Sequence, residues 1–255
     1  MKPNRMKAKM LAGEPACGCS LMFPSPQIVE MIGHAGFDWV LLDCEHGSLS
    51  LSDVELMAMA ADSVGITAIG RPRSNSSTDI QGIMDRGVMG VQVPHVNTVE
   101  DAQAAVSAVK FGGHSGRGLA AGTRPDSWGL GGRMPNFVTE ANAQTLVCVQ
   151  LEHELAIRNV EEILTVERVD VFFIGPSDLS QSMGHPGNPK APSVEAAIKA
   201  TLDKIKSAGK LAGMPANAEN VSNVVHAGVR YVYTHFPQLI RIGATAYLGS
   251  AAMVR

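Results

Sequence analysis

Short apolar segments recur along the chain, and each is followed by a stretch that has the period of an amphipathic helix. Stretches such as SDVELMAMAADS and VEAAIKATLDKIKSAG carry the helical spacing. The apolar segments are hydrophobic on both faces, as strands of an all-parallel sheet are. They span 16–22, 38–43, 66–71, 89–94, 145–152, 169–175, 211–215 and 230–235. The pattern therefore predicts eight strand–helix units.

A closed barrel accommodates these units better than an open sheet does. Gly36, Gly87 and Gly228 each stand where a helix ends shortly before a strand begins. The chain has no GxGxxG motif after its first strand, which removes the main reason for an open dinucleotide-binding sheet. Barrels of this class often reach about 250 residues as one domain. We predict one α/β domain over 1–255, a (β/α)8 TIM barrel.

Three further segments fall outside the repeated units. Residues 3–12 are expected to form a short helix before the barrel, and 237–253 a last helix with an apolar face suited to packing against another surface. Residues 110–144 are rich in glycine and too long for an ordinary connection. We expect this segment to be a functional loop that overhangs the active site.

Composition excludes several classes of protein. Hydrophobic residues make up 45% and charged residues 18% of the chain, as in globular proteins, and no apolar run suits a membrane span. The net charge of −3 without a basic stripe argues against nucleic acid as a partner. The basic N-terminus lacks the apolar stretch of a secretory signal, so the expected compartment is the cytoplasm. The cysteines lack paired spacing and are expected to be small buried hydrophobes.

Polar side chains follow the predicted strands at their carboxyl ends, where barrel enzymes build their active sites. Four predicted strands end in runs that contain charged or hydrogen-bonding residues. These runs are Asp43 to Gly47, Arg71 to Arg73, Gln150 to Glu152, and Gly175 to Asp178. Because the strand ends share one rim, we expect these groups to converge.

Each group suggests a role. Glu152 and Asp178 suit a divalent cation of the Mg²⁺ or Mn²⁺ type, although solvated loop carboxylates are the alternative. Asp43 lies three residues before His46 and is expected to orient the imidazole as a general base. Arg71 suits a substrate carboxylate or a developing enolate oxygen. No lysine ends a predicted strand, so a Schiff base has no candidate nucleophile, and the electron sink is expected to be a metal.

The turn into the helix after 169–175 adds a binding element. Gly175, Ser177 and Asp178 lie where free backbone N–H groups can hold a substrate carboxylate.

The segments LLDCEHG, GRPR, VQLE and FFIGPSDLSQSMGHPG, in this order, resemble those of the HpcH/HpaI family of metal-dependent class II pyruvate aldolases. The resemblance covers nearly the whole chain. It implies that Glu152 and Asp178 bind the metal (Mg²⁺ or Mn²⁺, with Co²⁺ a further candidate). It further implies that His46 with Asp43 supplies the catalytic base and that Arg71 holds the pyruvyl oxygen.

By the same resemblance, Gln150 and the Ser177 backbone line the pyruvate pocket, and the protein is a homohexamer, a trimer of dimers, whose subunits exchange their last helix. The implied reaction joins pyruvate to an aldehyde, or cleaves a 4-hydroxy-2-oxo acid, through a metal-stabilised enolate.

The sequence departs from the family pattern in the distal pocket. Residues 233–236 read YTHF where small and acidic residues are expected, and 122–129 read GTRPDSWG. These departures point to an unusual aldehyde. Two other readings remain: a 2-oxo acid decarboxylase of the oxaloacetate type, which uses the same site, and a catalytically silent barrel used for binding.

Overall fold

The chain folds into a closed barrel of parallel strands. The computed structural model describes residues 1–112 and 116–252. Each strand pairs with its neighbours in sequence, and β1 pairs with β8 to close the barrel. The strands are β1 Ala16–Leu21, β2 Trp39–Asp43, β3 Thr67–Arg71, β4 Gly90–Val93, β5 Leu146–Leu151, β6 Val171–Ile174, β7 Leu211–Pro215 and β8 Val229–His235. The predicted TIM barrel is confirmed, with strand limits within two residues of those expected.

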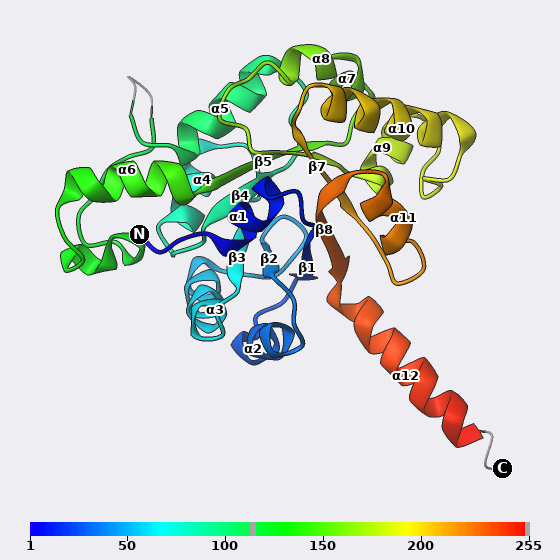
Figure 1. Cartoon of the computed structure of the whole chain (residues 1–255), viewed down its shortest axis with the longest axis horizontal. Coiled ribbons are helices and arrows are strands. Elements are labelled where there is room, and N and C mark those ends of the chain that lie inside the picture. Colours follow the sequence, from blue (N-terminus) through cyan, green and yellow to red (C-terminus); the bar gives the residue numbers. More distant parts are fainter. Residues whose placement is uncertain (113–115, 253–255) are drawn as a thin grey trace.

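Helices surround the barrel between successive strands (Figure 1). They are α1 Arg5–Leu11, α2 Pro26–His34, α3 Leu51–Ser63, α4 Ser77–Met84, α5 Val99–Val109, α6 Met134–Gln144, α7 Glu154–Arg158, α8 Val160–Ile163, α9 Pro176–Ser182, α10 Pro192–Ser207, α11 Val221–His226 and α12 Phe236–Ala252, with a 3-10 turn η1 at Arg124–Gly129. In the part of the chain that the structure describes, no helix has the length and apolarity needed to cross a membrane.

Local signals fix where the helices begin and end. Ser50 caps α3 through a reciprocal pair of hydrogen bonds with Asp53, which satisfies N–H groups that the first helical turn leaves free. Gly36, Gly87 and Gly228 adopt φ of +93°, +97° and +101°, a backbone conformation that side chains with a Cβ rarely take. The predicted stops between helix and strand are therefore confirmed.

Side chains at alternate strand positions fill two separate cores. Residues such as Val40 and Leu42 point outward and pack under the helices. Trp39, Leu41 and Tyr231 point inward and pack inside the barrel. This alternation follows from the period of two along a strand, and it places Asp43 and Arg71, which end β2 and β3, on the inward side at the barrel mouth.

The amino end of the barrel is closed by α1 and by the segment that precedes β5. Met6 and Met10 of α1 are fully buried against the inner core. Arg124, from the segment 116–144, pairs with Asp62 at 2.6 Å, where α3 ends. The expectation that 110–144 overhangs the active site is wrong for its described residues. Because this segment leads from a helix into a strand, it lies at the amino end of the barrel, away from the mouth. Residues 113–115 lie outside the described part.

The two terminal helices form where the sequence predicts them. The expected helix at 3–12 is α1, and the expected helix at 237–253 is α12, except that residue 253 lies outside the described part. Helix α12 projects away from the barrel (Figure 1) and has no buried residue. Phe236 and Leu239 in its first turn pack against the barrel, but Ile240, Tyr247 and Leu248 are 56%, 77% and 63% exposed, so these later apolar side chains have no cover within the described chain.

Candidate active site

A buried ion pair stands at the carboxyl ends of β2 and β3. Arg71 donates from Nε to Asp43 Oδ1 at 2.9 Å and from Nη2 to Asp43 Oδ2 at 2.5 Å. Asp43 is 0% and Arg71 5% exposed. Burial alone lowers the pKa of Arg71, but the Asp43 carboxylate outweighs this effect and holds the pKa above its usual range, so the guanidinium stays charged.

The Asp43 carboxylate is oriented by the turn that follows β2. Its Oδ1 also accepts hydrogen bonds from the backbone N–H of Glu45 at 3.0 Å and of His46 at 3.2 Å. The expected contact between this carboxylate and the His46 imidazole is not formed within the described chain, because Arg71 and the two N–H groups take up the oxygens. The imidazole is largely exposed, and its Nε2 lies 3.7 Å from Glu45 Oε2.

Glu152 is the buried carboxylate at the end of β5. It is 2% exposed, accepts a hydrogen bond from the Gln150 side chain, and accepts another from the backbone N–H of His95 at 2.9 Å. Burial raises the pKa of Glu152, while these two hydrogen bonds lower it. Glycine at 175 makes room for the carboxylate, since a Cβ there would lie 2.9 Å from Glu152 Cβ and Oε2.

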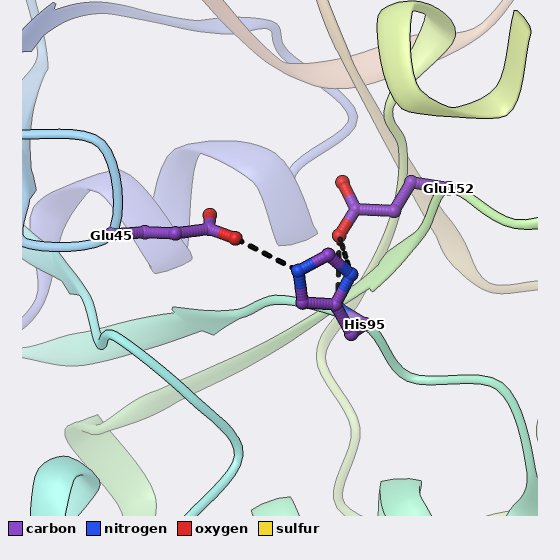
Figure 2. Close-up of side chains that lie close together, drawn as sticks. All are labelled: Glu45, His95 and Glu152. Carbon is purple, nitrogen blue, oxygen red and sulfur yellow. Dashed lines mark hydrogen bonds and ion pairs between the residues drawn. The ribbon is translucent and has the colours of Figure 1, made fainter. Parts of the chain in front are cut away.

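Glu45, His95 and Glu152 come together from three different strand ends (Figure 2). Nε2 of His95 lies 3.1 Å from Glu45 Oε1, and its Nδ1 lies 3.3 Å from Glu152 Oε1. One ligand atom from each residue falls within 4.8 Å of the others, a spacing that one metal ion can bridge. Glu45 Oε2 lies 3.2 Å from Arg71 Nε and so links this group to the buried ion pair.

Sequence reasoning missed two members of this group. Glu45 lies between Asp43 and His46 at the end of a predicted strand, but the sequence analysis predicted no role for it. His95 comes two residues after β4, and no role was predicted for it because, unlike His46, it has no comparable partner nearby in the sequence. Arg71 and Glu152 were identified as polar residues at the carboxyl ends of predicted strands. The same criterion also identifies His95 when it is applied to β4.

Asp178 and Ser177 lie in the first turn of α9, beside this group. Asp178 is half-buried and Ser177 exposed. Among the described residues, the group of side chains spaced to hold one metal ion consists of Glu45, His95 and Glu152, and Asp178 is not a member of it. An open cavity of about 690 Å³ has Ser177, Pro215 and His235 in its lining.

The end of β8 carries bulky polar side chains into the mouth. Tyr233 is buried and stacks on Phe173, with ring centroids 5.4 Å apart. His235 follows it two residues later. Burial, and then the charge of Arg71, lower the pKa of His235, so its imidazole is neutral at pH 7. Of the two rings, His235 lines the open cavity, at the edge where the sequence departs from the family pattern.

Comparison with known proteins identifies the family. The family model described as HpcH/HpaI aldolase/citrate lyase matches residues 18–234. A pyruvate aldolase of Rhizobium etli is 38% identical over 211 residues, which cover 83% of this chain and 82% of the relative. A hydroxypyruvate/pyruvate aldolase of Sagittula stellata is 32% identical, with 95% of this chain and 96% of the relative covered.

A solved structure supports the assignment. The HpcH/HpaI aldolase/citrate lyase family protein of Burkholderia cenocepacia superposes with a TM-score of 0.90 at 28% identity, over 97% of this chain and 99% of that one. The earlier resemblance is thus confirmed. The chain is a carbon–carbon lyase and belongs to the HpcH/HpaI aldolase/citrate lyase family.

Proposed function

We propose that this protein is a metal-dependent aldolase that joins pyruvate to an aldehyde, or cleaves a 4-hydroxy-2-oxo acid, within one domain spanning 1–255. The observation that carries the proposal is the pairing of a buried carboxylate, Glu152, with a buried and permanently charged Arg71 at one barrel mouth. The curated relatives named pyruvate aldolase and hydroxypyruvate/pyruvate aldolase support the substrate class.

Glu152 and Asp178 are the proposed metal ligands, with Mg²⁺, Mn²⁺ or Co²⁺ as the ion. The residues present fit such a group, because Glu152 is buried without a lysine or arginine partner among the described residues, and carboxylate oxygens are ligands for these ions. A bound ion supplies Lewis acidity that polarises the keto group of a 2-oxo acid.

The protein side chains supply binding and proton transfer. Arg71, fixed by Asp43, donates to the keto or carboxylate oxygen of the 2-oxo acid and stabilises charge that develops there. Gln150, Gly175 and the Ser177 backbone line the pyruvate pocket. In cleavage, His46 accepts the proton of the 4-hydroxyl as the C3–C4 bond breaks, and in synthesis it returns that proton.

Exchange of the pyruvate methyl protons in D2O, followed by proton NMR, tests the first half of this reaction. We expect exchange with added Mg²⁺, Mn²⁺ or Co²⁺ and none after chelation. A panel of aldehydes then tests carbon–carbon bond formation. Oxaloacetate decarboxylation that clearly exceeds aldol cleavage would instead favour the decarboxylase reading.

Replacing His46 separates its role from that of the metal ligands. His46→Ala should slow cleavage while metal affinity stays near that of the unmodified protein. His34→Ala, at the exposed end of α2, is the matched control and should change neither quantity. Unchanged turnover in His46→Ala would refute its assignment as the base.

We further propose a cytoplasmic homohexamer, a trimer of dimers in which subunits exchange α12. The projecting helix and its exposed Ile240, Tyr247 and Leu248 support an intersubunit role. Light scattering should report six chains, and Leu248→Glu should reduce that number. A monomeric mass for the unmodified chain would contradict the proposal.

A further inference from the structure

His95 is held in an unusual backbone conformation beside the proposed metal site. Its φ is +55°, in the left-handed region that residues with a Cβ seldom occupy. The backbone N–H of His95 donates to Glu152 Oε1 at 2.9 Å, which anchors the turn after β4 to the carboxylate. This anchor aims the imidazole between Glu45 and Glu152 (Figure 2).

The two ring nitrogens face different carboxylates. Nε2 lies 3.1 Å from Glu45 Oε1, so its N–H can be donated to that oxygen. This leaves the lone pair on Nδ1, which lies 3.3 Å from Glu152 Oε1. A carboxylate that holds the outer N–H of a histidine is the usual arrangement behind a metal-binding imidazole, because it fixes the tautomer and the ring orientation.

The spacing of the inner atoms also suits coordination. With bonds of roughly 2.1 Å, neighbouring ligand atoms around a divalent ion are about 3.0 Å apart in octahedral and about 3.4 Å apart in tetrahedral geometry. The separation of 3.3 Å between His95 Nδ1 and Glu152 Oε1 falls within this range. Glu45 is itself held in place by Arg71, 3.2 Å from its other oxygen.

We propose that His95 is a nitrogen ligand which shares the divalent cation with Glu152, and that Glu45 holds the imidazole in position. The inference rests on the proposed function, since it concerns the same ion. It adds an imidazole to a ligand set otherwise made of oxygen. Imidazole nitrogen suits transition-metal ions such as Zn²⁺, whereas Mg²⁺ prefers oxygen ligands, so the site should favour transition-metal ions over Mg²⁺.

Pulsed electron paramagnetic resonance of the Mn²⁺-loaded full-length protein tests the assignment directly. A coordinated imidazole gives an electron spin-echo modulation from ¹⁴N. We expect this modulation in the unmodified protein and in His46→Ala, which removes the neighbouring exposed imidazole, and we expect His95→Ala to lose it. Modulation that is missing from the unmodified protein, or that persists in His95→Ala, would overturn the proposal.

Metal titration of His95→Gly supplies an independent measurement. Glycine accepts the left-handed backbone, so this variant should melt no lower than the unmodified protein when both are free of metal. Its affinity for Mn²⁺ should fall at least about tenfold, a loss of the size that even outer partners of metal ligands produce. Its affinity for Mg²⁺ should fall less. Equal Mn²⁺ affinity in the two proteins would contradict the assignment.

The outcomes distinguish this inference from the proposed function. Metal-dependent pyruvate exchange without ¹⁴N modulation overturns the role of His95 and leaves the aldolase proposal standing. Failure to bind Mn²⁺, together with no metal-dependent exchange, overturns both.

Discussion

Removing the guanidinium of Arg71 should destabilise the protein strongly. Its partner Asp43 is 0% exposed, and Glu45 Oε2 lies 3.2 Å from the same guanidinium. Arg71→Met therefore leaves a buried carboxylate without its counter-charge. Loss of one partner from a buried pair costs about 3–5 kcal/mol. Since both side chains of this pair are almost inaccessible to water, solvent screening does not reduce the estimate.

The chain offers a matched control for this substitution. Arg158 pairs with Glu154 one helical turn away, and the two side chains are 68% and 45% exposed. An exposed pair of this kind is worth about 0.3–0.5 kcal/mol, so Arg158→Met should change stability very little. The two variants remove the same chemical group and differ in the burial of the pair.

Thermal unfolding at equal protein concentration measures the difference. For a domain of this size, 1 kcal/mol shifts Tm by roughly 2–4 °C. Arg71→Met should therefore melt about 6–20 °C lower than the unmodified protein, and Arg158→Met within about 2 °C of it. If Arg71→Met melted within 2 °C as well, the buried pair would not contribute in the way its geometry implies.

Three further predictions concern the barrel mouth. Gly175→Ala should displace the Glu152 carboxylate and weaken Mn²⁺ binding. Gly82→Ala in α4, where a Cβ meets only ordinary contacts, should leave Mn²⁺ binding unchanged. Equal Mn²⁺ affinities of the two variants in a titration would refute this prediction. The folded-state pKa of His235 lies below its unfolded value, so its contribution to stability is present above about pH 6.5 and declines as pH falls. In denaturant titrations, His235→Gln should therefore lose less stability between pH 7 and pH 5 than the unmodified protein does. Equal losses in the two proteins would contradict the assignment. Metal at about 100 times its Kd should stabilise the folded state by about 2.7 kcal/mol, so a chelator should lower Tm, and no shift would argue against a metal site.

The barrel was predictable from sequence because its signal is repeated. Each strand is apolar on both faces, and glycines such as Gly36 and Gly228 mark the ends of helices. The position of 110–144 could be predicted too, since any connection from a helix to the next strand lies at the amino end of the barrel. Its glycine content was instead taken as a sign of function, although Arg124 makes a structural ion pair there.

The candidate site was only partly predictable, because side-chain contacts depend on competition. Asp43 stands close to His46 in sequence, but the Arg71 fork and two backbone N–H groups occupy its oxygens. Likewise, the contact of His95 with Glu152 depends on the left-handed backbone conformation of His95, which no sequence pattern predicted. Spacing along the chain predicted which residues reach the mouth, and packing decided which of them meet.

The division of the barrel into a sealed floor and an open mouth has a practical consequence for directed evolution. Met6 and Met10 of α1 are buried at the opposite end from Arg71 and Glu152, and the inner core of the barrel lies between the two ends. Stabilising replacements in and around the floor can be accumulated first, because distant sites contribute additively to stability. The additional free energy of unfolding then allows Tyr233 and His235 to be randomised in search of new acceptor aldehydes while the protein stays folded.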